Sequence, residues 1–157
     1  MKRPFLILSI IGILISCNSD NDSPGLSGSN FLIFGHFYGE CGGEGCVEIF
    51  KLTEKKLYED TIDDYSGKNM EFVELGNDKF EQVKDLMDFF PNQLLLHKNE
   101  TVFGCPDCTD GGGLFIQYSN YGDVRSWRID QFKDNVPKYL HSFIDNVNEK
   151  IKLINNN

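Results

Sequence analysis

The sequence predicts an α+β fold: a small antiparallel sheet built from hairpins, one central helix and one long amphipathic helix at the C-terminus. Short segments of alternating or continuous apolar residues occur before residue 62 and again between residues 113 and 129, which is typical of strands. After residue 135 the apolar residues recur at helical spacing instead. The length of 157 residues suits one compact domain and is too short for two with adequate cores.

Three strand candidates come first along the chain. Residues 31–38 (FLIFGHFY) are apolar on both faces, which predicts a buried strand. Residues 46–52 (CVEIFKL) alternate between two faces, and residues 56–61 form a third strand candidate. Residues 63–69 (DDYSGKN) predict a turn.

The central helix is predicted over residues 78–90. Asn77 or Asp78 can cap its start, and Pro91 stops it. The apolar side chains at helical spacing are Phe80, Val83, Leu86, Met87 and Phe90.

A hairpin and a second helix complete the domain. Residues 113–118 and 124–129 predict two strands joined by a turn at residues 119–123. Asn135 can cap the final helix, and Pro137 falls in its first turn, where a missing N–H costs little. Its apolar face consists of Val136, Tyr139, Leu140, Phe143, Ile144, Val147, Ile151 and Ile154.

The N-terminus carries the pattern of a secretory signal. Lys2 and Arg3 precede an apolar run over residues 4–15, which is too short to span a bilayer as a helix. The tetrapeptide Leu14-Ile15-Ser16-Cys17 resembles the lipobox of bacterial lipoproteins. That resemblance implies cleavage before Cys17, which would then carry a diacylglycerol on sulfur and an acyl chain such as palmitate on its new amine.

The chain therefore divides into three expected parts. Residues 1–16 are a lipoprotein signal peptide, residues 17–30 are the lipidated cysteine and a polar tether, and residues 31–157 are a single α+β domain. Asp20 and Asp22 resemble a surface-export signal of Bacteroidota lipoproteins, which implies an outer-membrane anchor with the domain facing outward. The alternative is a solvated tether without sorting information.

The charge balance excludes one class of partner. The formal net charge is −9, from 15 basic and 24 acidic residues. Nucleic-acid binders need a cationic surface, so we expect no nucleic-acid partner. The expected partners are the membrane, through the lipid anchor, and a protein or glycan.

Four cysteines remain beyond the lipidated one: Cys41, Cys46, Cys105 and Cys108. They form two close pairs in Gly-rich loops, CGGEGC and CPDC, and export predicts disulfides within each loop. A zinc site made of all four thiolates, pairing across the domain, and free thiols are the alternatives. A thiol-redox role for CPDC is disfavoured because the motif leads into a strand and not into a helix that would stabilise a thiolate.

One aromatic group is a candidate binding surface. Tyr118, Tyr121, Arg125 and Trp127 lie on or between the two late strands, and an exposed group of this kind would be a recognition surface. The alternative is that Trp127 belongs to the core. No metalloprotease, nucleophile-elbow or phosphate-loop motif occurs, so no catalytic residue is assigned, and a non-enzymatic domain is favoured over an enzyme.

The segments GECGGEGCVEIFKL, CPDCTDGGG and WRIDQFKDNVPKYL resemble a group of small uncharacterised lipoproteins of the Bacteroidota type, which carry no known activity. The resemblance implies an envelope location and little else. The first hypothesis is a lipid-anchored, non-enzymatic binding or structural domain with two disulfides. A zinc-binding or thiol-redox lipoprotein is the second, and a small hydrolase is the third.

Overall fold

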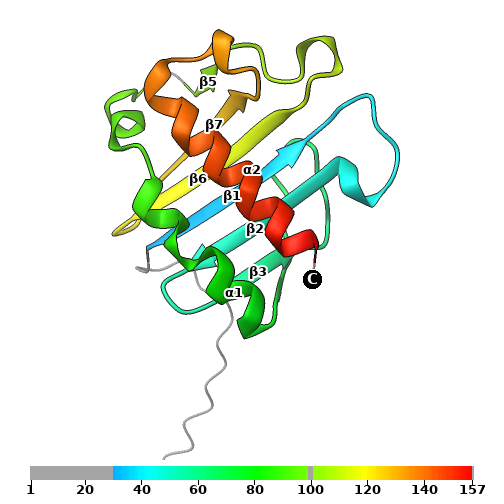
Figure 1. Ribbon diagram of the computed structural model, residues 1–157, viewed down its shortest axis with the longest axis vertical. Coiled ribbons are helices and arrows are strands. Elements are labelled where there is room, and N and C mark those ends of the chain that lie inside the picture. Colours follow the sequence, from blue (N-terminus) through cyan, green and yellow to red (C-terminus); the bar gives the residue numbers. More distant parts are fainter. Residues whose placement is uncertain (1–29, 99–100, 157) are drawn as a thin grey trace, which may run out of the picture.

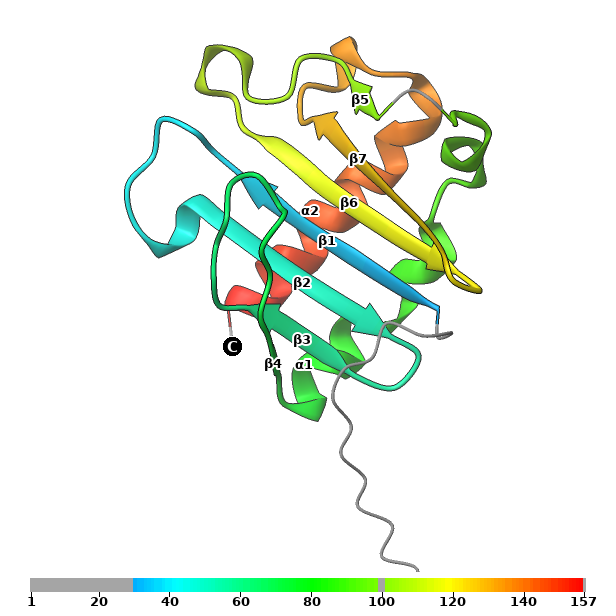
Figure 2. The same cartoon turned by 180° about the vertical axis from the view of Figure 1, so that it is seen from behind.

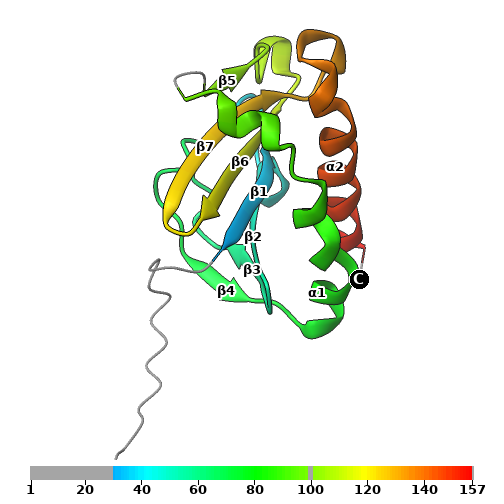
Figure 3. The ribbon, with the colours of Figure 1, turned by 90° about the vertical axis from the view of Figure 1, so that its left-hand side faces the viewer.

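The computed structural model describes residues 30–98 and 101–156. Within them a seven-stranded sheet carries helices on one face, as Figures 1 and 3 show, so the α+β class is confirmed. The strands, in the order β4-β3-β2-β1-β6-β7-β5 across the sheet, are β1 (Phe31–Phe37), β2 (Val47–Thr53), β3 (Leu57–Asp60), β4 (Phe72–Glu74), β5 (Val102–Phe103), β6 (Gly113–Asn120) and β7 (Asp123–Asp130). The α-helices are α1 (Asn77–Val83) and α2 (His141–Asn155), and the short 3₁₀ turns are η1 (Glu44–Cys46), η2 (Lys84–Phe89), η3 (Asn92–Leu96), η4 (Cys108–Asp110), η5 (Lys133–Asn135) and η6 (Lys138–Leu140).

The sheet is larger than expected and is mixed, not purely antiparallel. Strand β5 pairs in parallel with β7, whereas the other neighbouring strands are antiparallel. The two strands that were not predicted, β4 and β5, have three and two residues. Segments this short contain too little alternation to be distinguished from loop.

Both predicted helices are shorter than expected. The central one is α-helical only to Val83, where a φ of −123° ends the regular turn, and continues as η2 before Pro91. The C-terminal helix begins at His141, because Val136 is extended and Pro137 starts a separate 3₁₀ turn. A residue before proline is disfavoured in the α region, so this proline delays the helix and does not open it.

Strand β1 lies at the centre of the sheet and is buried on both faces. One face packs against α1, α2 and the 3₁₀ turns after α1 through the main core, which includes Leu32 and Phe34. The other face carries a second core that contains Phe31, Ile33 and Phe37, packed beside Met70 and Phe72. In Figure 2 the segment between β3 and β4 crosses in front of β2 on this second face. The burial of both faces explains the continuous apolar run of this strand.

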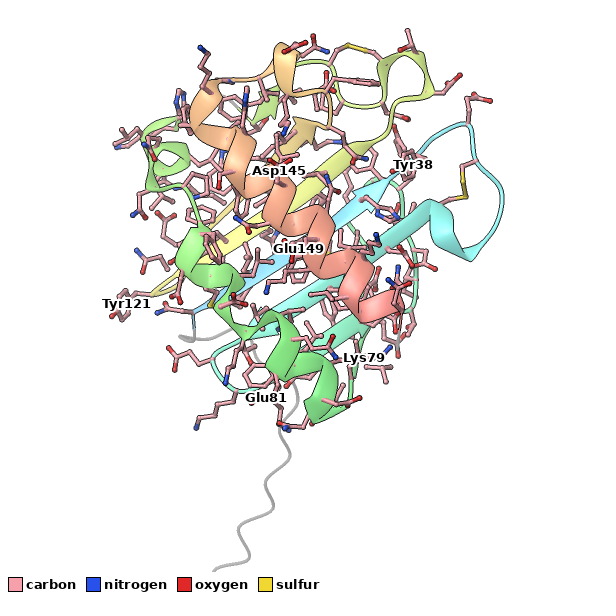
Figure 4. All side chains as sticks on the ribbon, in the orientation of Figure 1. Tyr38, Lys79, Glu81, Tyr121, Asp145 and Glu149 are labelled. Atoms are coloured by element: carbon pink, nitrogen blue, oxygen red, sulfur yellow. A yellow bond between two sulfur atoms is a disulfide. The ribbon has the colours of Figure 1, made fainter. Side chains whose placement is uncertain are left out.

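The strand register divides the sheet into two ends. At the N-terminal end, Phe31 is opposite Thr53 of β2 and Ser119 of β6. At the loop end, Phe37 is opposite Val47 and Gly113, so the cysteine loops that precede these two residues lie at this end. Figure 4 labels Tyr121 at the N-terminal end and Tyr38 at the loop end.

Asn30, the first described residue, belongs to the N-terminal end. Its side-chain oxygen accepts a hydrogen bond from the backbone N–H of Tyr121, with a distance of 3.0 Å. Tyr121 and Gly122 form a two-residue turn with φ values of 49° and 90°, so β6 and β7 extend further than the predicted five-residue turn allowed. The predicted signal peptide and Cys17 lie outside the described residues.

Candidate functional site

A cleft of about 640 Å³ opens at the loop end, between the two cysteine loops. It is the candidate functional site, and we refer to it as the loop-end cleft. Its described lining includes four carboxylate side chains, two tyrosines and no lysine or arginine. The lining residues are Tyr38, Gly39, Glu40, Cys41, Gly43, Cys46, Val47, Asp63, Tyr65, Asp107 and Asp110.

The first wall of the cleft is the loop between β1 and β2. A disulfide joins Cys41 to Cys46, whose Cα atoms are 5.6 Å apart. The backbone N–H of Tyr38 donates to the carbonyl of Cys46 over 2.8 Å and closes the base of the loop. Gly43 has a φ of 123°, a conformation that glycine adopts readily and that lets the loop turn back.

The second wall is the loop between β5 and β6. A disulfide joins Cys105 to Cys108, whose Cα atoms are 5.4 Å apart. The buried carboxylate of Asp130 anchors this loop, since it accepts hydrogen bonds from the N–H of Cys105 at 3.0 Å and from the side-chain amide of Asn135 at 2.7 Å. The loop therefore has a fixed base on the last residue of β7.

Asp107 connects the two walls with a third segment. Its Oδ2 accepts hydrogen bonds from the N–H of Gly39 at 2.8 Å and from the Tyr65 hydroxyl at 2.9 Å. Its Oδ1 accepts a third bond from the N–H of Gly112 at 3.1 Å. One carboxylate thus ties together the β1–β2 loop, the β3–β4 segment and its own loop.

Arg128 holds the β3–β4 segment against the sheet. Its guanidinium carbon lies 3.8 Å from the centre of the Phe37 ring and 4.8 Å from that of Tyr65. A guanidinium N–H also donates to the carbonyl of Tyr65 over 3.1 Å. Burial, together with the hydrogen bond to Asp107, raises the pKa of the Tyr65 phenol, so this hydroxyl stays protonated as a donor.

The surroundings of the cleft are acidic as well. A neighbouring hollow is lined by Glu48, Glu59, Asp60 and Asp63, and Asp63 belongs to both hollows. Burial raises the pKa of Glu59; the positive charge of Lys79 opposes this rise, and the negative charges of Glu48 and Asp63 add to it. The field at this end of the sheet therefore favours positively charged or hydrogen-bond-donating groups.

The arrangement of the cysteines confirms the prediction of disulfides within each loop. The four sulfur atoms do not converge on one point as a four-thiolate zinc site would require. Among the described residues, no group of three or more histidine, cysteine, aspartate or glutamate side chains is arranged to hold a metal ion.

The predicted aromatic surface is dispersed by the fold. Trp127 is 2% exposed and lies in the main core, and Tyr118 stacks on Phe90 with ring centres 4.1 Å apart. Arg125 donates to Asp123 and to the carbonyl of Leu95. Of the four candidates, only Tyr121 is exposed. These side chains therefore do not form one exposed recognition surface.

Sequence reasoning did not identify the residues that build the cleft. Asp107 lies inside the CPDC motif, which was interpreted only through its two cysteines. Tyr65 occurs in a segment that predicts a turn, and Arg128 in one that predicts a strand. One available signal was the acidic side chain within a Gly-rich loop, because aspartate accepts backbone N–H groups in such turns. Which loops it would join depends on the register of β1 and β6.

No protein-family model matches the chain, and no curated protein matches it either. Within residues 30–98 and 101–156, no helix has both the length and the apolar character needed to cross a membrane.

Proposed function

We propose that the chain is a lipid-anchored lipoprotein of the cell envelope, held in the outer membrane through Cys17, and that it is a non-enzymatic binding domain. One observation carries this proposal: the two disulfide loops form a cleft at the sheet end opposite Asn30, where the segment with the proposed anchor joins the domain. A ligand site placed this way would face away from the membrane.

The disulfides support an exported location. Disulfides form and persist in oxidising compartments and are rare in the cytosol. Each disulfide closes a short loop. In the chain-entropy model, a cross-link that closes a loop of four to six residues raises the free energy of unfolding by about 2 kcal/mol. The Cys41–Cys46 cross-link lines the cleft, and the Cys105–Cys108 cross-link lies in the loop that contributes Asp107 and Asp110 to the lining, so both restrict loops that would contact a ligand. Restricting a binding loop before binding lowers the entropy lost on association.

The partner that fits best is a protein or glycan segment rich in hydrogen-bond donors or positive charge. Carboxylates accept hydrogen bonds from hydroxyl, amide and ammonium groups. The tyrosines in the lining, Tyr38 and Tyr65, add apolar ring surface that can pack against such a segment. A volume of about 640 Å³ is within the range of known ligand sites.

The experiment has two parts on the full-length chain, produced in a host that processes lipoproteins. Mass spectrometry of the N-terminal peptide tests the anchor: diacylated or triacylated Cys17 is expected, and an unprocessed N-terminus would contradict it. Binding is then measured against amino-sugar and neutral oligosaccharides and against lysine-rich and glutamate-rich peptides. The amino-sugar and lysine-rich probes are expected to bind more tightly than the others.

A charge-matched pair of variants locates the binding. The cleft variant combines Glu40→Gln, Asp63→Asn and Asp110→Asn, where asparagine tolerates the φ values of 53° and 56° at the two aspartates. The control combines Asp88→Asn, Asp134→Asn and Glu149→Gln, which are exposed and outside the cleft lining. We expect at least tenfold weaker binding for the first variant and unchanged binding for the second. Equal losses would mean that the cleft is not the site.

A further inference from the structure

We propose that the N-terminal end of the sheet is a membrane-contacting surface, which lies on the lipid bilayer through four exposed apolar side chains. This inference rests on the proposed lipid anchor and goes beyond it, because an anchored domain can also remain suspended away from the bilayer. The four side chains are Phe89, Leu96, Tyr121 and Val124, and we refer to them as the apolar tip.

The exposure of these side chains is high for their size. Leu96 is 79% exposed and Tyr121 is 85% exposed, while Phe89 and Val124 are each a little under half exposed. Leucine and phenylalanine side chains gain free energy on leaving water. Tyrosine is enriched where a membrane meets water, since its ring is apolar and its hydroxyl is polar.

Contacts within the fold bring the four side chains to one end. Tyr121 and Val124 belong to the β6–β7 hairpin, beside Asn30. Phe90, next to Phe89, stacks on Tyr118, which is opposite Leu32 near the start of β1. The carbonyl of Leu95, next to Leu96, accepts a 2.7 Å hydrogen bond from the Arg125 guanidinium. Figure 3 views the molecule from this side, with the β6–β7 hairpin and the start of β1 in view.

The position and length of the preceding chain identify the bilayer as the occupant. The proposed anchor, Cys17, is 13 residues before Asn30 in the sequence. A fully extended chain of 13 residues is at most about 45 Å long. A Gly- and Ser-rich coil of that length has a root-mean-square span of about 20 Å. The apolar tip is next to the point where this chain joins the domain, so the anchor holds it near the bilayer at a high effective concentration.

The two charges on the β6–β7 hairpin do not oppose contact with a neutral bilayer. Arg125 donates two hydrogen bonds to the Asp123 carboxylate, at 3.1 and 2.8 Å, so these two charges compensate each other. The chain as a whole is acidic, with a net charge of −9, and an anionic bilayer would repel it. A zwitterionic surface is therefore the appropriate partner.

The test uses the full-length lipidated chain reconstituted into phosphatidylcholine vesicles with and without bromine atoms on the acyl chains. Bromine quenches tryptophan fluorescence at short range, and the only natural tryptophan, Trp127, is 2% exposed and provides the baseline. The reporter is Tyr121→Trp. The matched control is Phe132→Trp, which places the same reporter at a 55% exposed position beside Gly111 in the second cysteine loop.

We expect the added fluorescence of Tyr121→Trp to shift to the blue and to be lost in brominated vesicles, while that of Phe132→Trp is retained. If the protein floats with the vesicles but both reporters are retained, or both are lost alike, this inference is overturned and the anchor stands. If the protein does not float and its N-terminal peptide carries no lipid, the anchor itself is wrong and the inference falls with it. A Leu96→Ser change in the Tyr121→Trp chain should weaken the quenching, and unchanged quenching would contradict a contact through the whole tip.

Discussion

Replacing Asp107 with alanine removes the acceptor of three hydrogen bonds that join the segments around the loop-end cleft. A typical hydrogen bond contributes about 0.5–1.5 kcal/mol, and Asp107 is only partly buried, so the three together contribute about 2 kcal/mol. Asp107 also has a φ of 64°, where alanine costs about a further 1 kcal/mol. We therefore expect Asp107→Ala to lower the free energy of unfolding by about 3 kcal/mol.

Two companion variants separate these contributions. Asp110 has a similar φ of 56°, is exposed, and makes no side-chain hydrogen bond in the described part of the chain, so Asp110→Ala should cost only the conformational part, about 1 kcal/mol. Asp107→Asn keeps one acceptor oxygen and tolerates the φ value, so it should lose one bond, about 1 kcal/mol. Equilibrium urea unfolding of the full-length chains measures all three. The reasoning is refuted if Asp107→Ala costs no more than Asp110→Ala.

Three further predictions concern the sheet and the charges around it. Gly35→Ala should prevent folding, as measured by circular dichroism, because the new Cβ would overlap the Glu48 carbonyl in the centre of the sheet. The control Gly42→Ala should fold normally, because a Cβ at Gly42 has nothing within 4 Å. A folded Gly35→Ala chain would contradict the observed packing. Lys51→Met should raise the melting temperature at neutral pH, because burial lowers the pKa of the Lys51 ammonium and makes its charged form less favourable in the fold than in water. This gain should shrink as the pH approaches 10.5, where the lysine is neutral in both states. A lower melting temperature would show that the attraction of the ammonium to the surrounding rings dominates. Hydrogen bonds, first among them that from the N–H of Ser66, lower the pKa of Asp64 to about 2. The stability that the Asp64 carboxylate provides is therefore present above pH 3.8 and lost as the pH falls toward 2. Asp64→Asn should flatten this part of the plot of melting temperature against pH, and parallel plots for the two chains would contradict this role of Asp64.

Sequence patterns predicted most strands and both helices, and failed for the two shortest strands. The β1 segment was recognisable because both faces are apolar, and the two late strands because they flank a turn. Strands β4 and β5 were not, since two or three residues do not establish a period. The parallel pairing of Val102 with Arg128 depends on how the chain returns from η3 to the sheet, which no local pattern specifies.

The candidate site shows the same division. Cysteine spacing was sufficient to predict the local disulfides, because glycine-rich loops of four to six residues can close on themselves. The cleft between them required knowing that β1 and β6 are neighbours, which places residues about 70 positions apart in contact, as the Gly39–Asp107 hydrogen bond does at a separation of 68 residues. Trp127 is a residue whose place the sequence left open, because an alternating strand has both a core face and a surface face. In the structure Trp127 is buried and lies beside Phe90, which assigns it to the core face.

The central position of β1 has a mechanical consequence for a domain held by its N-terminus. Any pulling force transmitted through the residues before Asn30 enters the fold at Phe31, along the axis of a strand that is hydrogen-bonded on both sides. The bonds to β2 and β6 run perpendicular to this axis, so a pull loads both ladders at once in shear. An edge strand could be peeled away one bond at a time, whereas β1 can leave only when many bonds break together. The proposed anchor would thus attach the domain through a strand that is hydrogen-bonded on both sides and resists being pulled out.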